Sequence, residues 1–262
     1  MARRNSFYIL YKGHAATPSD AVGDFMKRRM KECILRKTPT LFEILKYHRE
    51  TAFVLAASFV ALFIAGIAST LVIPELRPGG LGALRNGGES GSLGWLISSA
   101  YSEGNIPYAM AVTFLVNLMW AGFLQTTLPT FVVPYLGVVV TGLRFLLWGI
   151  LFTPVGANDQ SIFIHYITLF LEGFAYALAA LAAWIHSRMF LRPGLYGLRS
   201  RIQGYKAGLV ATAKIYIIII PALIMAAAYE AISVRGQNKS SSKSYAKAER
   251  SVNNAVVRIL DV

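Results

Sequence analysis

The sequence predicts an all-α fold: a polytopic transmembrane helical bundle of about five spans, preceded by amphipathic cytoplasmic helices. Three observations predict this fold. Hydrophobic residues make up 55% of the 262 residues and charged residues only 15%, whereas a soluble domain carries roughly 25% charge. The apolar residues gather in runs long enough to cross a bilayer as helices. The 26 lysines and arginines lie almost wholly outside these runs, at their ends.

The first fifty residues form a basic, amphipathic segment. Apolar side chains recur there at helical spacing, namely Val22, Phe25, Met26, Met30 and Cys33. The other side of that helix carries Lys27, Arg28 and Lys31, which we expect to contact anionic lipid head groups. Two interpretations stay open for this segment: a helix on the membrane surface, or a packed cytoplasmic helical hairpin. In either case a new helix is expected to begin at a capping box formed by Thr40 and Glu43.

Five apolar runs follow between residues 51 and 232, the predicted transmembrane domain. The spans are expected at about 51–73, 107–128, from the reversal at Pro129 and Pro134 to 152, 162–186 and 207–232. A four-span alternative treats 129–153 as a re-entrant pair. Residues 233–262 are predicted to be a flexible basic tail, with a Ser/Lys linker at 237–244 and a weakly amphipathic helix after it.

Basic residues are unevenly divided between the two sides of the predicted bundle. The N-terminal segment holds eleven and the loop 188–206 five, against two in the Gly-rich stretch 77–101 and six in the tail. Because basic loops stay in the cytoplasm, we expect a multi-pass protein of the cell membrane with a cytoplasmic N-terminus and an extracellular C-terminus. Within the basic loop, Arg199 and Arg201 are expected to contact lipid head groups.

Polar side chains interrupt three of the spans at one depth. Asn117, Arg144 and Glu172 each lie roughly 14–16 Å from the outer end of the helix, at ~1.5 Å per residue. We expect an ion pair between Arg144 and Glu172, with Asn117 satisfying the remaining hydrogen bonds. Such a cluster either fixes helix register or forms an ion, proton or polar-substrate site; the third alternative is that the three never meet. Glu230, near the end of the last span, is either a packing or partner contact or an exposed carboxylate.

Several classes of function are disfavoured. The net charge of +13 gathers at the ends of the apolar runs, which indicates membrane orientation rather than nucleic-acid binding. Cys33 is the only cysteine and the four histidines lack metal-ligand spacing, so we expect no metal and no cofactor. The sequence contains no P-loop, zinc-protease or serine-hydrolase motif, and we therefore expect a protein that is not an enzyme.

Three segments resemble the stage II sporulation protein M family of integral membrane proteins. They are residues 114–117 (FLVN), 171–175 (LEGFA) and 221–231 (PALIMAAAYEA). The order of segments is also similar over about 20–235, although the paired asparagines of the family appear here as Asn117 and Leu118. The resemblance implies an integral membrane protein of the kind that acts as a scaffold for other proteins.

Two functions follow as hypotheses. The first is a non-enzymatic membrane scaffold or assembly subunit, whose partners are other membrane proteins, further copies of itself or anionic lipids. The second is a membrane transport protein or permease subunit that uses the mid-membrane polar cluster, since broken helices with Pro and Gly often line substrate sites.

Overall fold

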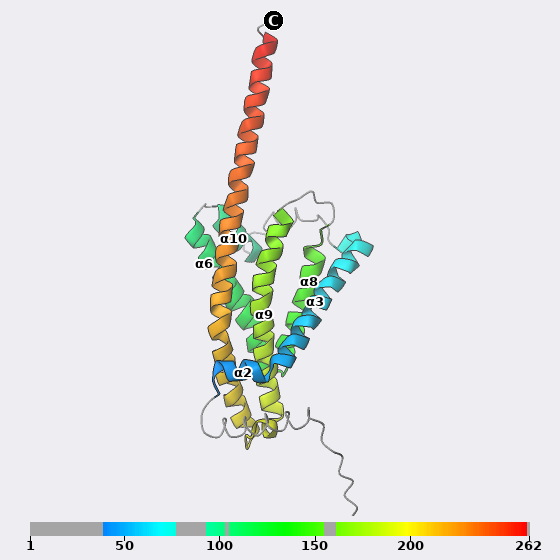
Figure 1. Ribbon diagram of the computed structural model, residues 1–262, viewed down its shortest axis with the longest axis vertical. Helices are drawn as coiled ribbons and strands as arrows, with labels where there is room; N and C mark the ends of the chain where they lie inside the picture. Colours follow the sequence, from blue (N-terminus) through cyan, green and yellow to red (C-terminus); the bar gives the residue numbers. More distant parts are fainter. Residues whose placement is uncertain (1–38, 77–92, 103–104, 155–160, 261–262) are drawn as a thin grey trace, which may run out of the picture. The chain divides into compact units, whose positions relative to one another are not determined.

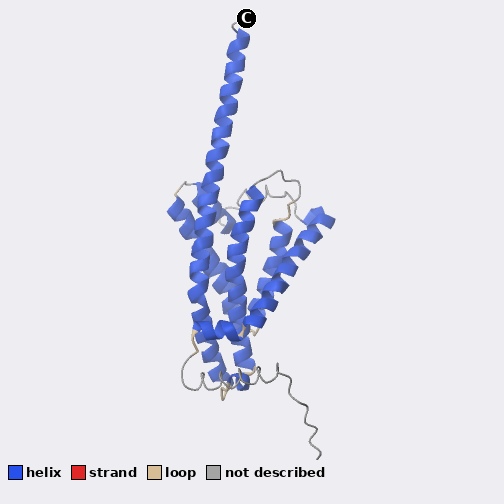
Figure 2. Ribbon diagram, in the orientation of Figure 1, coloured by secondary structure: helices blue, strands red, loops and turns tan. Residues whose placement is uncertain are grey.

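The computed structural model describes residues 39–76, 93–102, 105–154 and 161–260. The chain divides into two units, Met1–Thr40 and Leu41–Val262, and every described helix belongs to the second. No strand occurs within the described ranges (Figure 2). The helices are α2 (Leu41–Tyr47), α3 (Arg49–Val72), η1 (Pro74–Leu76), α5 (Leu93–Ser102), α6 (Ile106–Leu115), η2 (Val116–Thr127), α7 (Leu128–Val132), α8 (Leu136–Leu151), α9 (Ser161–Leu191), η3 (Pro193–Tyr196) and α10 (Arg201–Leu260) (Figure 1). The expected amphipathic helix of the first unit lies outside the described residues.

Four helical stretches are long and apolar enough to cross a membrane. They are Arg49–Val72, Ile106–Val132, His165–Leu191 and Arg201–Val234, of 24, 27, 27 and 34 residues. A helix needs about 20 apolar residues to cross the hydrocarbon of a bilayer. The all-helical fold is thus confirmed, and it is compatible with a multi-pass membrane protein. The remaining apolar helix, α8, is shorter, at 16 residues.

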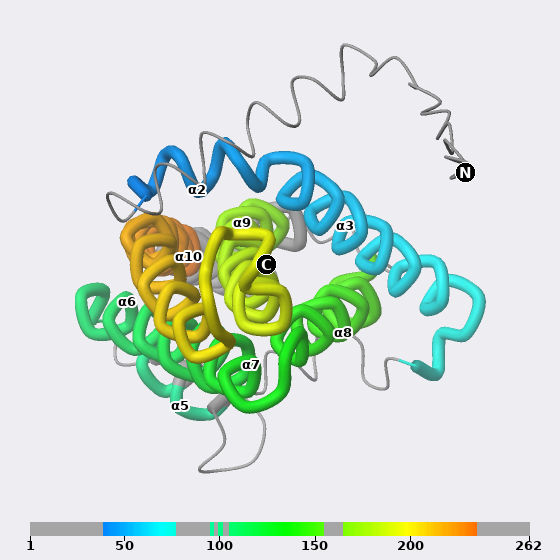
Figure 3. The backbone as a smooth tube through the Cα atoms, turned by 90° about the horizontal axis from the view of Figure 1, so that it is seen from below, coloured from blue at the N-terminus to red at the C-terminus, as the bar shows by residue number. Residues whose placement is uncertain are grey.

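Helix α9 occupies the middle of the bundle, with α10, α3, α8 and α7 around it (Figure 3). Its alanines at 179, 180, 182 and 183 are at most 2% exposed, because small side chains let the neighbouring helices approach closely. Helix α10 runs antiparallel to α9. A Cβ atom on Gly204 would lie 2.1 Å from the Met189 carbonyl oxygen, and one on Gly208 would lie 2.9 Å from the Cα of His186.

Helices α3 and α8 also meet backbone to backbone, at a pair of glycines. A Cβ atom on Gly66 would lie 2.9 Å from the Cα of Gly149. One to two turns before these glycines, the rings of Phe59 and Phe145 stack with 5.1 Å between centroids. The residue numbers rise together along both helices, so α3 and α8 are parallel.

The reversal before α8 depends on three specific contacts. Tyr135 has a left-handed backbone (φ 66°), and its N–H donates to Ser187 Oγ over 2.8 Å. The N–H of Gly137 donates to Thr130 Oγ1, also over 2.8 Å. A side chain at position 137 would clash with the Thr126 carbonyl oxygen, 1.9 Å from an ideal Cβ. Glycine is therefore required there by close approach of two helices.

The second membrane-length helix changes its winding in the middle. It is α-helical in α6, a π-helix over the 12 residues of η2, and α-helical again in α7. The hydroxyls of Thr126 and Thr127 follow the wider winding and donate to the carbonyls of Ala121 and Gly122, five residues back, over 2.9 and 3.0 Å. π-Helical segments are rare in proteins, and those that occur are often found at functional sites.

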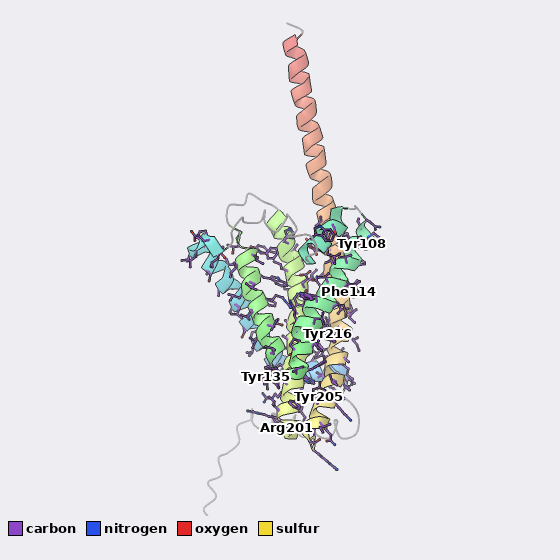
Figure 4. All side chains as sticks on the ribbon, turned by 180° about the vertical axis from the view of Figure 1, so that it is seen from behind. Tyr108, Phe114, Tyr135, Arg201, Tyr205 and Tyr216 are labelled. Atoms are coloured by element: carbon purple, nitrogen blue, oxygen red, sulfur yellow. The ribbon has the colours of Figure 1, made fainter. Side chains whose placement is uncertain are left out.

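Helix α10 continues without a break from Arg201 to Leu260, 60 residues, or about 90 Å at ~1.5 Å per residue. The sequence predicts a Ser/Lys linker at 237–244 instead. Proline is the strongest helix breaker, and the helix contains one only at Pro221. Figure 4 shows Tyr108 and Arg201 at opposite ends of the helix bundle, with Tyr216 of α10 between them.

Candidate functional site in the helical bundle

Asn117 and Glu172 meet inside the bundle. Asn117, in the first turn of η2, donates from Nδ2 to Glu172 Oε1 of α9 over 2.5 Å. The Glu172 side chain is buried, with 8% of its surface exposed. A carboxyl group buried this deeply needs hydrogen-bond donors, and the amide supplies one of them.

Arg144 of α8 contacts groups other than Glu172, with which an ion pair was expected. Its Nη2 donates to the Ala121 carbonyl over 3.0 Å and to Gln125 Oε1 over 2.6 Å. Its guanidinium also lies over the ring of Tyr176, 4.6 Å from the centroid. The charge of Arg144 reaches Glu172 only through space, so the carboxyl group has no direct cationic partner in the part of the chain described.

Gln125 is a site residue that the sequence reasoning missed. Equal depth along a helix does not fix the direction in which a side chain points, and the π-helical winding of η2 turns Gln125 and the Ala121 carbonyl towards α8. The available signal was an amide side chain eight residues after Asn117 in an otherwise apolar run.

Glu230 of α10 adds a second carboxyl group to this region. It is hydrogen-bonded to the phenol of Tyr101 on α5, and the Tyr101 hydroxyl also pairs with Thr113 Oγ1 of α6 over 3.1 Å. The carboxyl groups of Glu172 and Glu230 lie within electrostatic reach of each other. Six elements therefore contribute to one polar network, defined here as Tyr101, Thr113, Asn117, Gln125, Arg144, Glu172, Tyr176 and Glu230.

Four buried polar atoms have no hydrogen-bond partner within the described residues: Arg144 Nη1, Thr168 Oγ1, His186 Nδ1 and Thr212 Oγ1. Thr168 precedes Glu172 by one turn on the same face of α9. An unpaired polar group in a hydrocarbon environment costs several kcal/mol. Of the four, Arg144 Nη1 belongs to the network and Thr168 Oγ1 lies one helical turn from Glu172, so these two atoms are available to a water molecule or a hydrogen-bonding ligand.

The remaining predicted contacts lie away from this network. Arg199, between η3 and α10, and Arg201, the first residue of α10, are both exposed. Lys27, Arg28 and Lys31 lie outside the described residues. No group of three or more His, Cys, Asp or Glu side chains that could hold a metal ion occurs in the described ranges.

A separate aromatic cluster surrounds His48, the residue between α2 and α3. His48 is 4% exposed and lies against Tyr47, Trp184 and Tyr196, with ring centroids 4.7, 5.6 and 6.1 Å away. Arg188 lies over the Trp184 ring, 4.8 Å from its centroid. Burial, and next the charge of Arg188, lower the pKa of His48 to about 4. The cluster fixes the short helix α2 against η3 and α9.

Comparisons with known proteins give no match: no family model, no curated protein and no solved structure is similar to this chain. The polar network therefore has to be interpreted from its own chemistry.

Proposed function

We propose that this protein is a multi-pass membrane transport protein, or the membrane subunit of one, that binds a cation at Glu172 and Glu230. One observation carries the proposal. The buried carboxyl group of Glu172 on α9 and the partly buried one of Glu230 on α10 interact electrostatically, while Arg144, whose charge also acts on Glu172, is hydrogen-bonded to Ala121 and Gln125. Ionisable groups within membrane-spanning helices are costly and mark ion pathways and proton relays.

A five-crossing topology belongs to this proposal. Helix α8 contacts α9 near both of its ends: Tyr135 donates to Ser187 over 2.8 Å, and Tyr166 donates to the Phe152 carbonyl over 2.7 Å. Positions 166 and 187 are about 32 Å apart along a helix, close to the thickness of the hydrocarbon core. We therefore propose that α8 crosses the membrane despite its 16 residues, with the N-terminus in the cytoplasm and the C-terminus outside.

Flux through vesicles tests the transport proposal. The purified protein would be reconstituted into liposomes, and entry of protons, radioactive sodium and radioactive rubidium would be compared with empty vesicles. We expect at least one cation to enter faster, and Glu172→Gln to reduce that rate by about tenfold or more. Glu50→Gln, at an exposed carboxylate in the first turn of α3, is the matched control. Entry no faster than in empty vesicles for all three cations would remove the proposal.

A non-enzymatic scaffold or assembly subunit is the second candidate. It is favoured by α10, which continues from Val234, the end of its membrane-length stretch, to Leu260, about 39 Å further. The resemblance to stage II sporulation protein M proteins agrees with this role. We expect a chain truncated after Val234 to lose the partners, or the self-association, that the full-length protein shows in cross-linking of native membranes. Identical cross-linked products from the two chains would contradict the scaffold hypothesis.

A further inference from the structure

Polar groups lie between Glu172 and the end of the bundle where the membrane-length stretch of α10 ends, at Val234. Glu230 lies four residues before Val234, about 6 Å along the helix. Glu172 lies seven residues after His165, the start of the membrane-length stretch of α9, which is about 10 Å. Tyr101 binds Glu230 and Thr113, and its phenol is within electrostatic reach of Glu172 as well. Tyr101 belongs to α5, which is not one of the membrane-length helices.

The Thr168 side chain is a separate observation that favours a bound ligand beside these polar groups. Its side chain is 6% exposed, and its hydroxyl has no partner among the described groups. The residue sits one helical turn from Glu172, on the side nearer to that end of the bundle and on the same face of α9. A buried hydroxyl that can both donate and accept is suited to a ligand that moves by exchanging hydrogen bonds.

The groups around the two carboxyls distinguish a proton from a metal cation. A lone pair of Glu172 Oε1 is occupied by the Asn117 N–H, and the positive charge of Arg144 lies within electrostatic reach. The hydrogen bond takes up one coordination position and the positive charge repels a cation, and a metal ion would also need several additional oxygen ligands. A proton needs only an acceptor oxygen and a hydrogen-bonded route.

We infer that the ion bound by this protein is a proton, held by one of the two carboxyls of Glu172 and Glu230 and exchanged with the outside through Tyr101. The inference rests on the transport function proposed above.

The exchange conserves protons at each step. The carboxylic acid of Glu172 gives its proton to the carboxylate of Glu230. The resulting Glu172 carboxylate keeps the Asn117 hydrogen bond and the field of Arg144. Glu230 then loses the proton to the Tyr101 oxygen, while the Tyr101 hydroxyl hydrogen passes to water. The groups that face this path are Tyr101 from α5, Arg144 from α8, Glu172 and Tyr176 from α9, and Glu230 from α10.

Infrared difference spectroscopy on the detergent-solubilised protein tests the bound proton without requiring transport. Between two pH values at which exposed carboxylates stay ionised, wild type should show a change in the carbonyl stretch of a protonated carboxylic acid. The difference spectrum should change in Glu172→Gln and in Glu230→Gln but not in Glu50→Gln. An unchanged spectrum in both variants overturns the inference, and circular dichroism of each variant checks that it has folded.

Proton flux separates this inference from the transport proposal. With a pH-sensitive dye inside the vesicles and a potassium ionophore to balance charge, we expect Tyr101→Phe to slow proton entry about tenfold and leave the infrared band in place. Flux of sodium or rubidium that needs Glu172 but is independent of pH would overturn the proton assignment and keep the transport function. A titrating band without any flux would keep the bound proton and remove transport.

Discussion

The side-chain amide of Asn117 reaches Glu172 across 55 positions of sequence and joins η2 to α9 over 2.5 Å. The two residues lie in helices that run in the same direction, since Phe131 further along the first meets His186 further along the second, with 4.9 Å between ring centroids. This hydrogen bond and the Phe131–His186 contact together set the register between these two helices. The hydrogen bond also leaves Arg144 free to bind the π-helical backbone instead.

Asn117→Leu should destabilise the protein. The change removes the donor to Glu172 and leaves a buried carboxyl group unsatisfied, at a cost of about 1–2 kcal/mol. Thermal unfolding in detergent should show a lower midpoint, whereas Met119→Leu, at a half-exposed position of η2 (49%), should leave it unchanged. Adding Glu172→Leu to Asn117→Leu should recover part of the loss. Strictly additive losses would show that the two side chains do not interact.

Much of the fold follows from the sequence because the bilayer imposes it. The first apolar run, 51–73, corresponds to α3 at Arg49–Val72, and the second, 107–128, lies within Ile106–Val132. Long apolar runs can satisfy their backbone in hydrocarbon only as helices, so local composition decides the outcome. The depth of Asn117 and Glu172 was readable from the sequence for the same reason.

The partners of Arg144 could not be predicted from the sequence in this way. An α-helix of ordinary winding was assumed for the second span, and the π-helix of η2 changes which side chains face α8. That change depends on tertiary contacts such as Arg144 to Ala121, which have no local sequence signal. The bond from Tyr101 to Glu230 was missed because no feature of the sequence of α5 indicates which helix Tyr101 contacts.

Gly149→Ala should separate α3 from α8. A Cβ atom at position 149 would lie 2.0 Å from the Phe63 carbonyl oxygen and 2.9 Å from the Cα of Gly66, and backbone on both sides leaves no flexible side chain to move. We expect a loss of about 1–3 kcal/mol in stability. Gly194→Ala is the control, because nothing lies within 4 Å of its added Cβ. Equal unfolding midpoints for the two variants would argue against the glycine contact.

His48 should make the stability depend on pH. Its pKa is about 4 in the folded chain, against an ordinary value of 6.5, so protonation favours the unfolded state. The stability supplied by the neutral ring is fully present above about pH 6.5 and declines as the pH falls towards 4, by about 3 kcal/mol in total. Denaturant unfolding across this range measures the effect, and His48→Gln should flatten the curve below pH 6.5. An unchanged slope in His48→Gln would assign the pH dependence to other groups.

The number of crossings has a direct chemical test, because Cys33 is the only cysteine of the chain. If α8 crosses the membrane, the chain crosses five times and its two ends lie on opposite sides. A membrane-impermeant maleimide added to intact cells should leave Cys33 unlabelled, and should label Ser240→Cys in a Cys33→Ser background. Permeabilising the membrane should make Cys33 reactive, which controls for a thiol that is simply inaccessible. Equal labelling of the two positions in intact cells would mean an even number of crossings, with α8 entering and leaving on one side. In that topology the basic tail and the basic N-terminal segment would share the cytoplasm, as the positive-inside rule alone would also allow.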